Sequence, residues 1–183
     1  LSMRPDYHRV LELGNEVLAS DSDPARLRAA ATMNASAYTT FGDWERASHY
    51  NERAVEYAIQ VGNVPGIEVA KAQRGLILMQ LGQLDEAKVA ILEALEHLAK
   101  FEEHNAISGR AVVSLQLGMI YLLEGDLPAA ELRFKQSAAL ATNADHVTVQ
   151  MNSSLMQGIV TVMQDSLSEG VTLICRGLAD RFR

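Results

Sequence analysis

Residues able to do chemistry are few in this chain of 183 residues, and they are scattered along it. Glu93 and His97 are four residues apart, so on one helix both side chains could reach a common ion. No second pair of this kind accompanies them, so we do not predict a metal site. Cys175, the only cysteine, is predicted to be a small packing residue, with a Cys–His nucleophile pair as the alternative.

Motifs that bind phosphate or activate a serine are absent from the sequence. It contains no GxxxxGK[ST], no GxGxxG after a strand and no GxSxG. Lys71 and Arg74 lie one helical turn apart and could anchor an acidic group, but the favoured interpretation is a solvated or salt-bridged pair, with Glu68 within reach. We therefore predict a protein that is not an enzyme and needs neither a metal nor another cofactor.

The overall charge limits the possible partners further. The formal net charge is -7, and such a chain lacks the positive field that nucleic-acid binders use. No stretch approaches 18 consecutive apolar residues, and no signal peptide opens the chain. A single cysteine excludes an internal disulfide and fits a reducing compartment. We expect a cytoplasmic protein that binds neither nucleic acid nor membrane through this segment.

Five columns of residues recur at nearly constant spacing. Small residues separated by 40, 43 and 40 positions form the first column: Ala35, Gly75, Gly118 and Gly158. The turn pairs that follow are Gly42-Asp43, Gly82-Gln83, Gly125-Asp126 and Asp165-Ser166. The next large apolar residues are Trp44, Leu84, Leu127 and Leu167. The small residues after them are Ala47, Ala87, Ala130 and Gly170, then Ala54, Ala94, Ser137 and Gly177.

These columns predict stacked pairs of antiparallel helices. Two helices approach closely where their residues are small, Gly-Asp forms the turn and caps the second helix, and one pair alone cannot bury its apolar face. We predict one all-α domain over residues 1–183, with about nine helices and no strand. It comprises a half repeat over 5–20 and repeats over about 25–61, 65–101, 105–141 and 146–183. Because it begins in mid-repeat, we expect it to be part of a longer protein.

The pattern resembles the tetratricopeptide repeat (TPR) family over about Asp6–Arg183. The third copy matches best, through Gly118, Tyr121, Gly125, Asp126, Ala130 and Phe134. The common TPR period is about 34 residues, so the spacing here resembles longer variants. These include the sensor domains of large bacterial regulators of the LuxR and maltose-activator type, and scaffolds that bind helical or extended peptides. The resemblance implies a right-handed α-α superhelix, a TPR-like solenoid.

The resemblance also implies a concave groove lined by the first helix of each repeat. In the first copy its residues would be Ala29, Thr32, Ser36 and Thr39. The second and third copies would add Val69, Ala72, Gln73, Leu76 and Met79, then Val112, Leu115, Gln116, Met119 and Leu122. The fourth would add Asn152, Leu155, Ile159 and Val162. We expect a polar lip leading to an apolar trough, with closure of this surface into core as the alternative.

The groove suggests a function without catalysis. The leading hypothesis is a protein–protein interaction module that binds a segment of a partner, or a neighbouring domain. The alternative is a ligand- or signal-sensing domain of a bacterial transcriptional regulator. The family's carboxylate clamp for chaperone C-termini is not expected, because its cationic residues are missing. The positions of its Lys, Asn and Arg residues hold Thr32, Ser36, Gln73, Val112 and Gln116. Self-association through the repeat ends is a further possibility.

Overall fold

The computed structural model describes residues 6–179, and all regular structure in this range is helical. Nine helices are present there, in agreement with the all-α prediction. Their bounds are α1 (Tyr7–Ser20), α2 (Pro24–Phe41), α3 (Trp44–Gln60), α4 (Val64–Gln80), α5 (Leu84–Leu98), α6 (His104–Leu123), α7 (Leu127–Asn143), α8 (Val147–Met163) and α9 (Leu167–Ala179).

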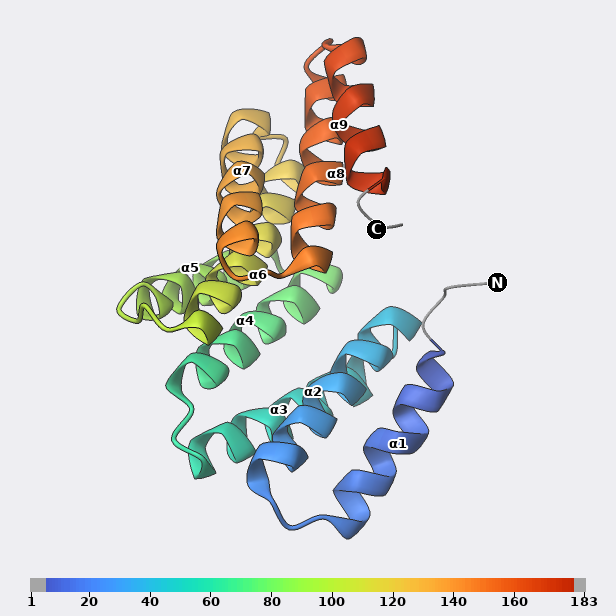
Figure 1. The fold of residues 1–183 in the computed structure, drawn as a ribbon, viewed down its shortest axis with the longest axis vertical. Coiled ribbons are helices and arrows are strands. Elements are labelled where there is room, and N and C mark those ends of the chain that lie inside the picture. The colour runs from blue at the N-terminus through green and yellow to red at the C-terminus, as the bar shows by residue number, and fades with distance from the viewer. Residues whose placement is uncertain (1–5, 180–183) are drawn as a thin grey trace.

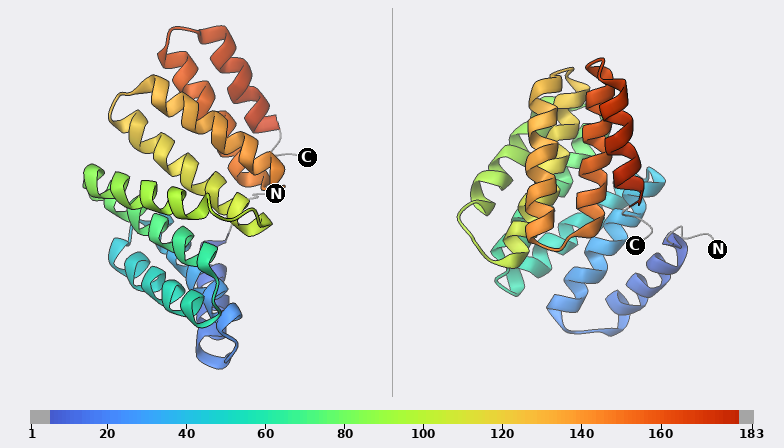
Figure 2. Two further views of the ribbon diagram at one scale, coloured as in Figure 1. Left: turned by 90° about the vertical axis from the view of Figure 1, so that its left-hand side faces the viewer. Right: turned by 45° about the horizontal axis from the view of Figure 1, so that its top comes forward.

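The helices form a superhelical stack of antiparallel pairs. The most extensive contacts are within the pairs α2–α3, α4–α5, α6–α7 and α8–α9, and α1 packs on α2. Successive pairs lie one above the other along the long axis (Figures 1 and 2). The first helices α4, α6 and α8 also contact one another in sequence, whereas α2 makes at most a marginal contact with α4. The stack therefore has an interruption in its inner layer between α2 and α4.

Small residues lie where the two helices of a pair cross, as the columns predict. A Cβ placed on Gly118 would lie 2.5 Å from Cε1 of Phe134, a ring that is fully buried. In the last pair, a Cβ on Gly158 would come within 2.8 Å of the carbonyl oxygen of Gly170. Each crossing thus depends on the missing or minimal side chain to bring the helices together.

The turns within the pairs also follow the prediction. Gly42, Gly82 and Gly125 have positive φ angles of 74°, 80° and 79°. The carboxylates of Asp43 and Asp126 cap α3 and α7 by accepting backbone hydrogen bonds. The fourth copy differs because Asp165 adopts a φ of 65° where the other copies have glycine.

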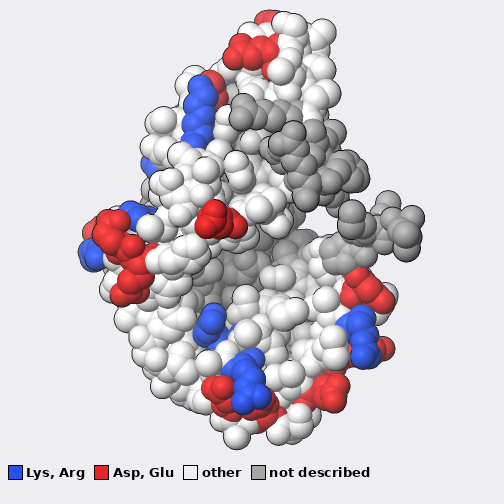
Figure 3. Space-filling model, viewed as in Figure 1, with Lys and Arg blue, Asp and Glu red and all other residues white. Residues whose placement is uncertain are grey.

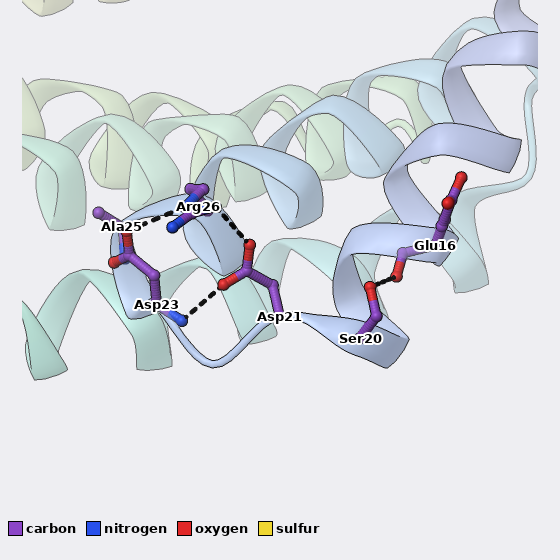
Figure 4. Close-up of polar contacts among 6 residues, drawn as sticks. All are labelled: Glu16, Ser20, Asp21, Asp23, Ala25 and Arg26. Atoms are coloured by element: carbon purple, nitrogen blue, oxygen red, sulfur yellow. Dashed lines mark hydrogen bonds and ion pairs between the residues drawn. The ribbon is translucent and has the colours of Figure 1, made fainter.

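The connection from α1 to α2 is fixed by two carboxylates and one guanidinium (Figure 4). Asp23 accepts a hydrogen bond from the backbone N–H of Ala25 at 2.9 Å, and Pro24 begins the helix, as predicted. The Arg26 guanidinium lies 3.0 Å from Asp21 and 3.1 Å from Asp23. These bonds fix the first turn of α2.

The largest buried cluster lies between α4, α5 and α6 and includes Ile91, Leu98, Leu117 and Ile120. Around α1–α3, the buried apolar side chains are all alanines. By length and composition α6 is apolar enough to cross a membrane, but half of that stretch is buried inside the protein. Its contacts with α4, α5, α7 and α8 account for this composition.

Candidate functional site

The first helices position the predicted groove residues as two groups. The polar residues on α2 are mostly accessible: Thr32 and Ser36 are exposed, and Thr39 is half-buried. Asn152, the polar residue on α8, is also exposed. The half-buried apolar residues are Val69, Leu76, Val112, Leu115, Met119, Leu122, Leu155, Ile159 and Val162. These exposures are compatible with a polar end beside a half-buried apolar stretch. Their role in binding stays a prediction.

Three predicted groove residues lie inside the protein instead. Ala72, Met79 and Gln116 are only 0%, 5% and 5% exposed. The cause is the close approach of α6 to α4, where a Cβ on Gly109 would lie 2.7 Å from Cγ2 of Val69. This burial corrects the predicted lining, because the accessible trough between these helices is narrower than the repeat pattern implies.

Half-burial of Leu76, Leu115 and Met119 means that the groove is not fully closed by the protein's own helices. Each of these side chains rests on a buried cluster while part of its surface reaches solvent. We call this half-buried row, together with Leu122, the trough. It presents apolar surface without an open channel beneath it.

A cavity of about 390 Å³ lies beside the trough, between α2, α4 and α6. It occupies the interruption between the first helices of the first and second pairs. Four of its lining residues are predicted groove residues: Thr32, Val69, Gln73 and Val112. The surface is hollowed between the N-terminal helices and the upper part of the stack (Figure 3). We call this cavity the Arg28 pocket.

Several lining residues were not identified from the sequence. They are Arg28, Asn51, Asn63, His104, Asn105, Ser108 and His146. Arg28 and Ser108 lie one helical turn before Thr32 and Val112, so extending each groove face by one turn would have found both. The first residues of α6 and the residue before α8 enter the site because the N-terminal ends of these helices converge on the cavity.

The polar side chains of the Arg28 pocket are held by specific contacts. The Asn51 amide donates to the carbonyl oxygen of Ala70 at 2.8 Å, and Asn63 caps α4 by accepting from the N–H of Gly66 at 2.9 Å. Nε of Arg28 is buried and has no hydrogen-bond partner among the described residues. The pocket therefore combines fixed amides with one unused cationic donor.

The other candidate groups have structural contacts away from this pocket. Glu68 is buried, and its carboxylate lies 2.8 Å from Nζ of Lys71 and 3.0 Å from Nδ1 of His97. This agrees with the favoured salt bridge for Lys71 and joins His97 to Glu68 rather than to Glu93. In the described part of the chain, no group of three or more His, Cys, Asp or Glu residues could hold a metal ion.

Cys175 differs from its prediction. It is exposed on α9 rather than packed between helices. The small-residue column of that pair is occupied by the buried Gly177, two positions later, so the thiol falls on a different face of the helix.

Comparison with solved structures identifies the repeat type. No family model and no curated relative matches the sequence. A Podospora anserina kinesin light chain with TPR-like repeats superposes with a TM-score of 0.57 at 18% identity, over 96% of this chain and 86% of that one. The chain has a TPR-like fold. BtubC from P. vanneervenii also matches this TPR-like stack, with a TM-score of 0.63 at 19% identity, over 97% of this chain and 74% of that one.

A Rap protein complexed with Competence and Sporulation Factor gives a TM-score of 0.73 at 15% identity. The match covers 95% of the TPR-like chain described here but only 48% of the Rap chain. At these identities the likeness concerns the fold alone. None of these neighbours is a LuxR-type regulator, so that finer resemblance stays a prediction.

Proposed function

We propose that this TPR-like chain is a non-catalytic interaction module that binds an extended polypeptide segment along its concave face. The observation that carries the proposal is the Arg28 pocket beside the half-buried trough. Together they offer a polar cavity next to half-buried apolar surface, a combination that suits a peptide with mixed side chains. We further propose that the protein acts in the cytoplasm.

The structural neighbours support the same class of function. The Rap protein of similar fold was crystallised with Competence and Sporulation Factor, and we propose that the present chain likewise receives a partner in its superhelix. TPR-like stacks present long concave surfaces that a partner segment can follow. Met119 in the trough has a flexible side chain that can adapt to different apolar partners.

The test uses peptides selected from a random display library on the immobilised chain. Their affinity is measured for the wild type and for a trough variant, Leu76→Asp with Met119→Asp. A control variant, Val89→Asp with Leu132→Asp, places the same charges on side chains that are 56% and 54% exposed on second helices. We expect the trough variant to lose about tenfold or more in affinity, since a buried unpaired charge opposes apolar contact, and the control to bind normally.

A second variant tests the same surface without changing any residue that packs on the core. Thr32 is exposed and lines the pocket, so Thr32→Trp fills the cavity without entering the core. Circular dichroism verifies that each variant remains helical. Peptides that bind all variants equally would contradict the proposal.

A sensing domain of a bacterial transcriptional regulator is the second candidate. It is supported by the position of the Arg28 pocket, since the cavity lies where α2 and α4 barely touch. A ligand there would contact both α1–α3 and the later pairs and would bias their relative position. The sequence flanking this segment in the intact protein tests the idea: a nucleotide-binding domain before it and a helix-turn-helix after it would favour the regulator.

A further inference from the structure

The Arg28 pocket has a charge that contrasts with the rest of the protein. The sequence contains 23 acidic and 16 basic residues, excluding histidine. Yet no Asp or Glu is among the residues that line the pocket in the described structure, whereas Arg28, His104 and His146 are. The N-terminal ends of α4 and α6 also border it and add the positive end of the helix dipole. An anionic group would meet attraction here without a competing carboxylate.

Arg28 itself is available for such a group. Two residues earlier, Arg26 is engaged by the carboxylates of Asp21 and Asp23 (Figure 4). Arg28 has no such partner in the described part of the chain, and its buried Nε makes no hydrogen bond there. The terminal NH₂ groups of Arg28 carry the same positive charge and would donate to a ligand oxygen.

Neighbouring amides provide further donors. Gln73 uses its amide oxygen to accept from Nε2 of Gln116 at 3.5 Å, and Asn105 uses its own to accept from the N–H of Ala106 at 2.9 Å. Both oxygens are thereby engaged, which leaves the two NH₂ groups to donate. With Arg28, this produces a donor-rich lining suited to a carboxylate.

We propose that the Arg28 pocket binds a carboxylate of the partner segment, with Arg28 as its charge partner. This rests on the proposed function and specifies the chemistry of the segment that binds. Val69 and Val112 line the pocket on the helices that carry the trough, so apolar residues beside the carboxylate would continue along α4 and α6. The recognised segment is an extended peptide with an acidic side chain or a free C-terminus next to apolar residues.

The test compares matched pools of fluorescent peptides by fluorescence polarisation with the whole chain. Each pool has randomised apolar positions around one fixed residue, which is Asp in one pool and Asn in the other. Both are prepared with a free and with an amidated C-terminus, which separates a side-chain carboxylate from a terminal one. We expect the carboxylate form to bind about tenfold more tightly, as for a charge-assisted hydrogen bond.

Three substitutions then test whether Arg28 causes the preference for the carboxylate peptides. Arg28→Gln should abolish it, and Arg28→Lys should retain part of it because the charge remains. Arg133→Gln is the matched control, since it removes the same charge from α7, where Arg133 contacts Gln136 rather than the pocket. Circular dichroism confirms that the variants remain folded.

The outcomes separate this inference from the proposed function. Equal binding of carboxylate and neutral pools, or a preference that survives Arg28→Gln, would overturn the carboxylate site. If such binding were still lost in the trough variant, the groove function would stand without it. Failure of every pool to bind the wild type would count against both.

Discussion

The packing of Gly118 against Phe134 provides a quantitative test of the repeat architecture. The Gly118→Ala substitution places a Cβ 2.5, 2.7 and 3.1 Å from three atoms of the Phe134 ring. Favourable carbon contacts are about 3.5–4.0 Å, so the ring must move by roughly 1 Å. Phe134 is fully buried and packs with Ala130 and Val160, which leaves little room for that movement.

The expected cost follows from two opposing terms. Overpacking a core costs about 1–3 kcal/mol, while alanine is favoured over glycine inside a helix by about 1 kcal/mol. We therefore expect Gly118→Ala to lower the free energy of unfolding by up to about 2 kcal/mol. Phe134→Leu alone should also destabilise, because it leaves a cavity. In the double variant the clash is absent. Its loss of unfolding free energy should therefore be about 2 kcal/mol smaller than the sum of the losses in the two single variants.

Urea unfolding followed by far-UV circular dichroism measures all four free energies of the cycle. The control is Gly82→Ala combined with Phe134→Leu. A Cβ at Gly82 meets no atom within 4 Å and is disfavoured only by the φ of 80°, so that pair should be additive. Additivity within about 0.5 kcal/mol at Gly118 and Phe134 as well would refute the packing argument.

Two further predictions concern polar contacts. Ser137 donates to the Ala111 carbonyl at 2.7 Å and accepts from the Ser153 hydroxyl at 2.8 Å. Ser137→Ala should therefore lower the free energy of unfolding in urea by about 1–2 kcal/mol, a larger loss than that of Ser153→Ala. A larger loss for Ser153→Ala would contradict this network. The Ala25 N–H, and then Arg26, lower the pKa of Asp23, so its stabilisation is present above its unfolded pKa and is lost as pH falls through its folded pKa. Asp23→Asn keeps the capping oxygen, so the variant's unfolding free energy should fall less steeply below about pH 3.9 than that of the wild type; equal slopes would count against the assignment.

The helix pairs were predictable because their determinants are local in sequence. Small residues at the crossings, glycines at the turns and the caps by Asp43 and Asp126 each act within one pair. A column that repeats therefore implies a helix pair that repeats. Asp165 shows the limit of this logic, since it adopts the glycine conformation without being glycine.

The site was less predictable because it depends on contacts between pairs. Met79 faces inward because α4 and α6 approach closely, and Gly109, which permits this, belongs to none of the repeated columns. The Arg28 pocket exists because α2 and α4 do not pack in the same way as α4 and α6. Neither the close packing of α4 on α6 nor the gap between α2 and α4 is encoded by a residue pattern within one repeat.

Methyl NMR of the chain with a library-selected peptide tests the central claim most directly. Leu, Val and Met methyl groups report on both surfaces, with Leu76, Leu115 and Met119 in the trough and Val89 and Leu132 exposed on second helices. If the concave face binds the segment, the peptide should shift the trough methyls and leave Val89 and Leu132 unchanged. Shifts confined to Val89, Leu132 and their neighbours would contradict the account.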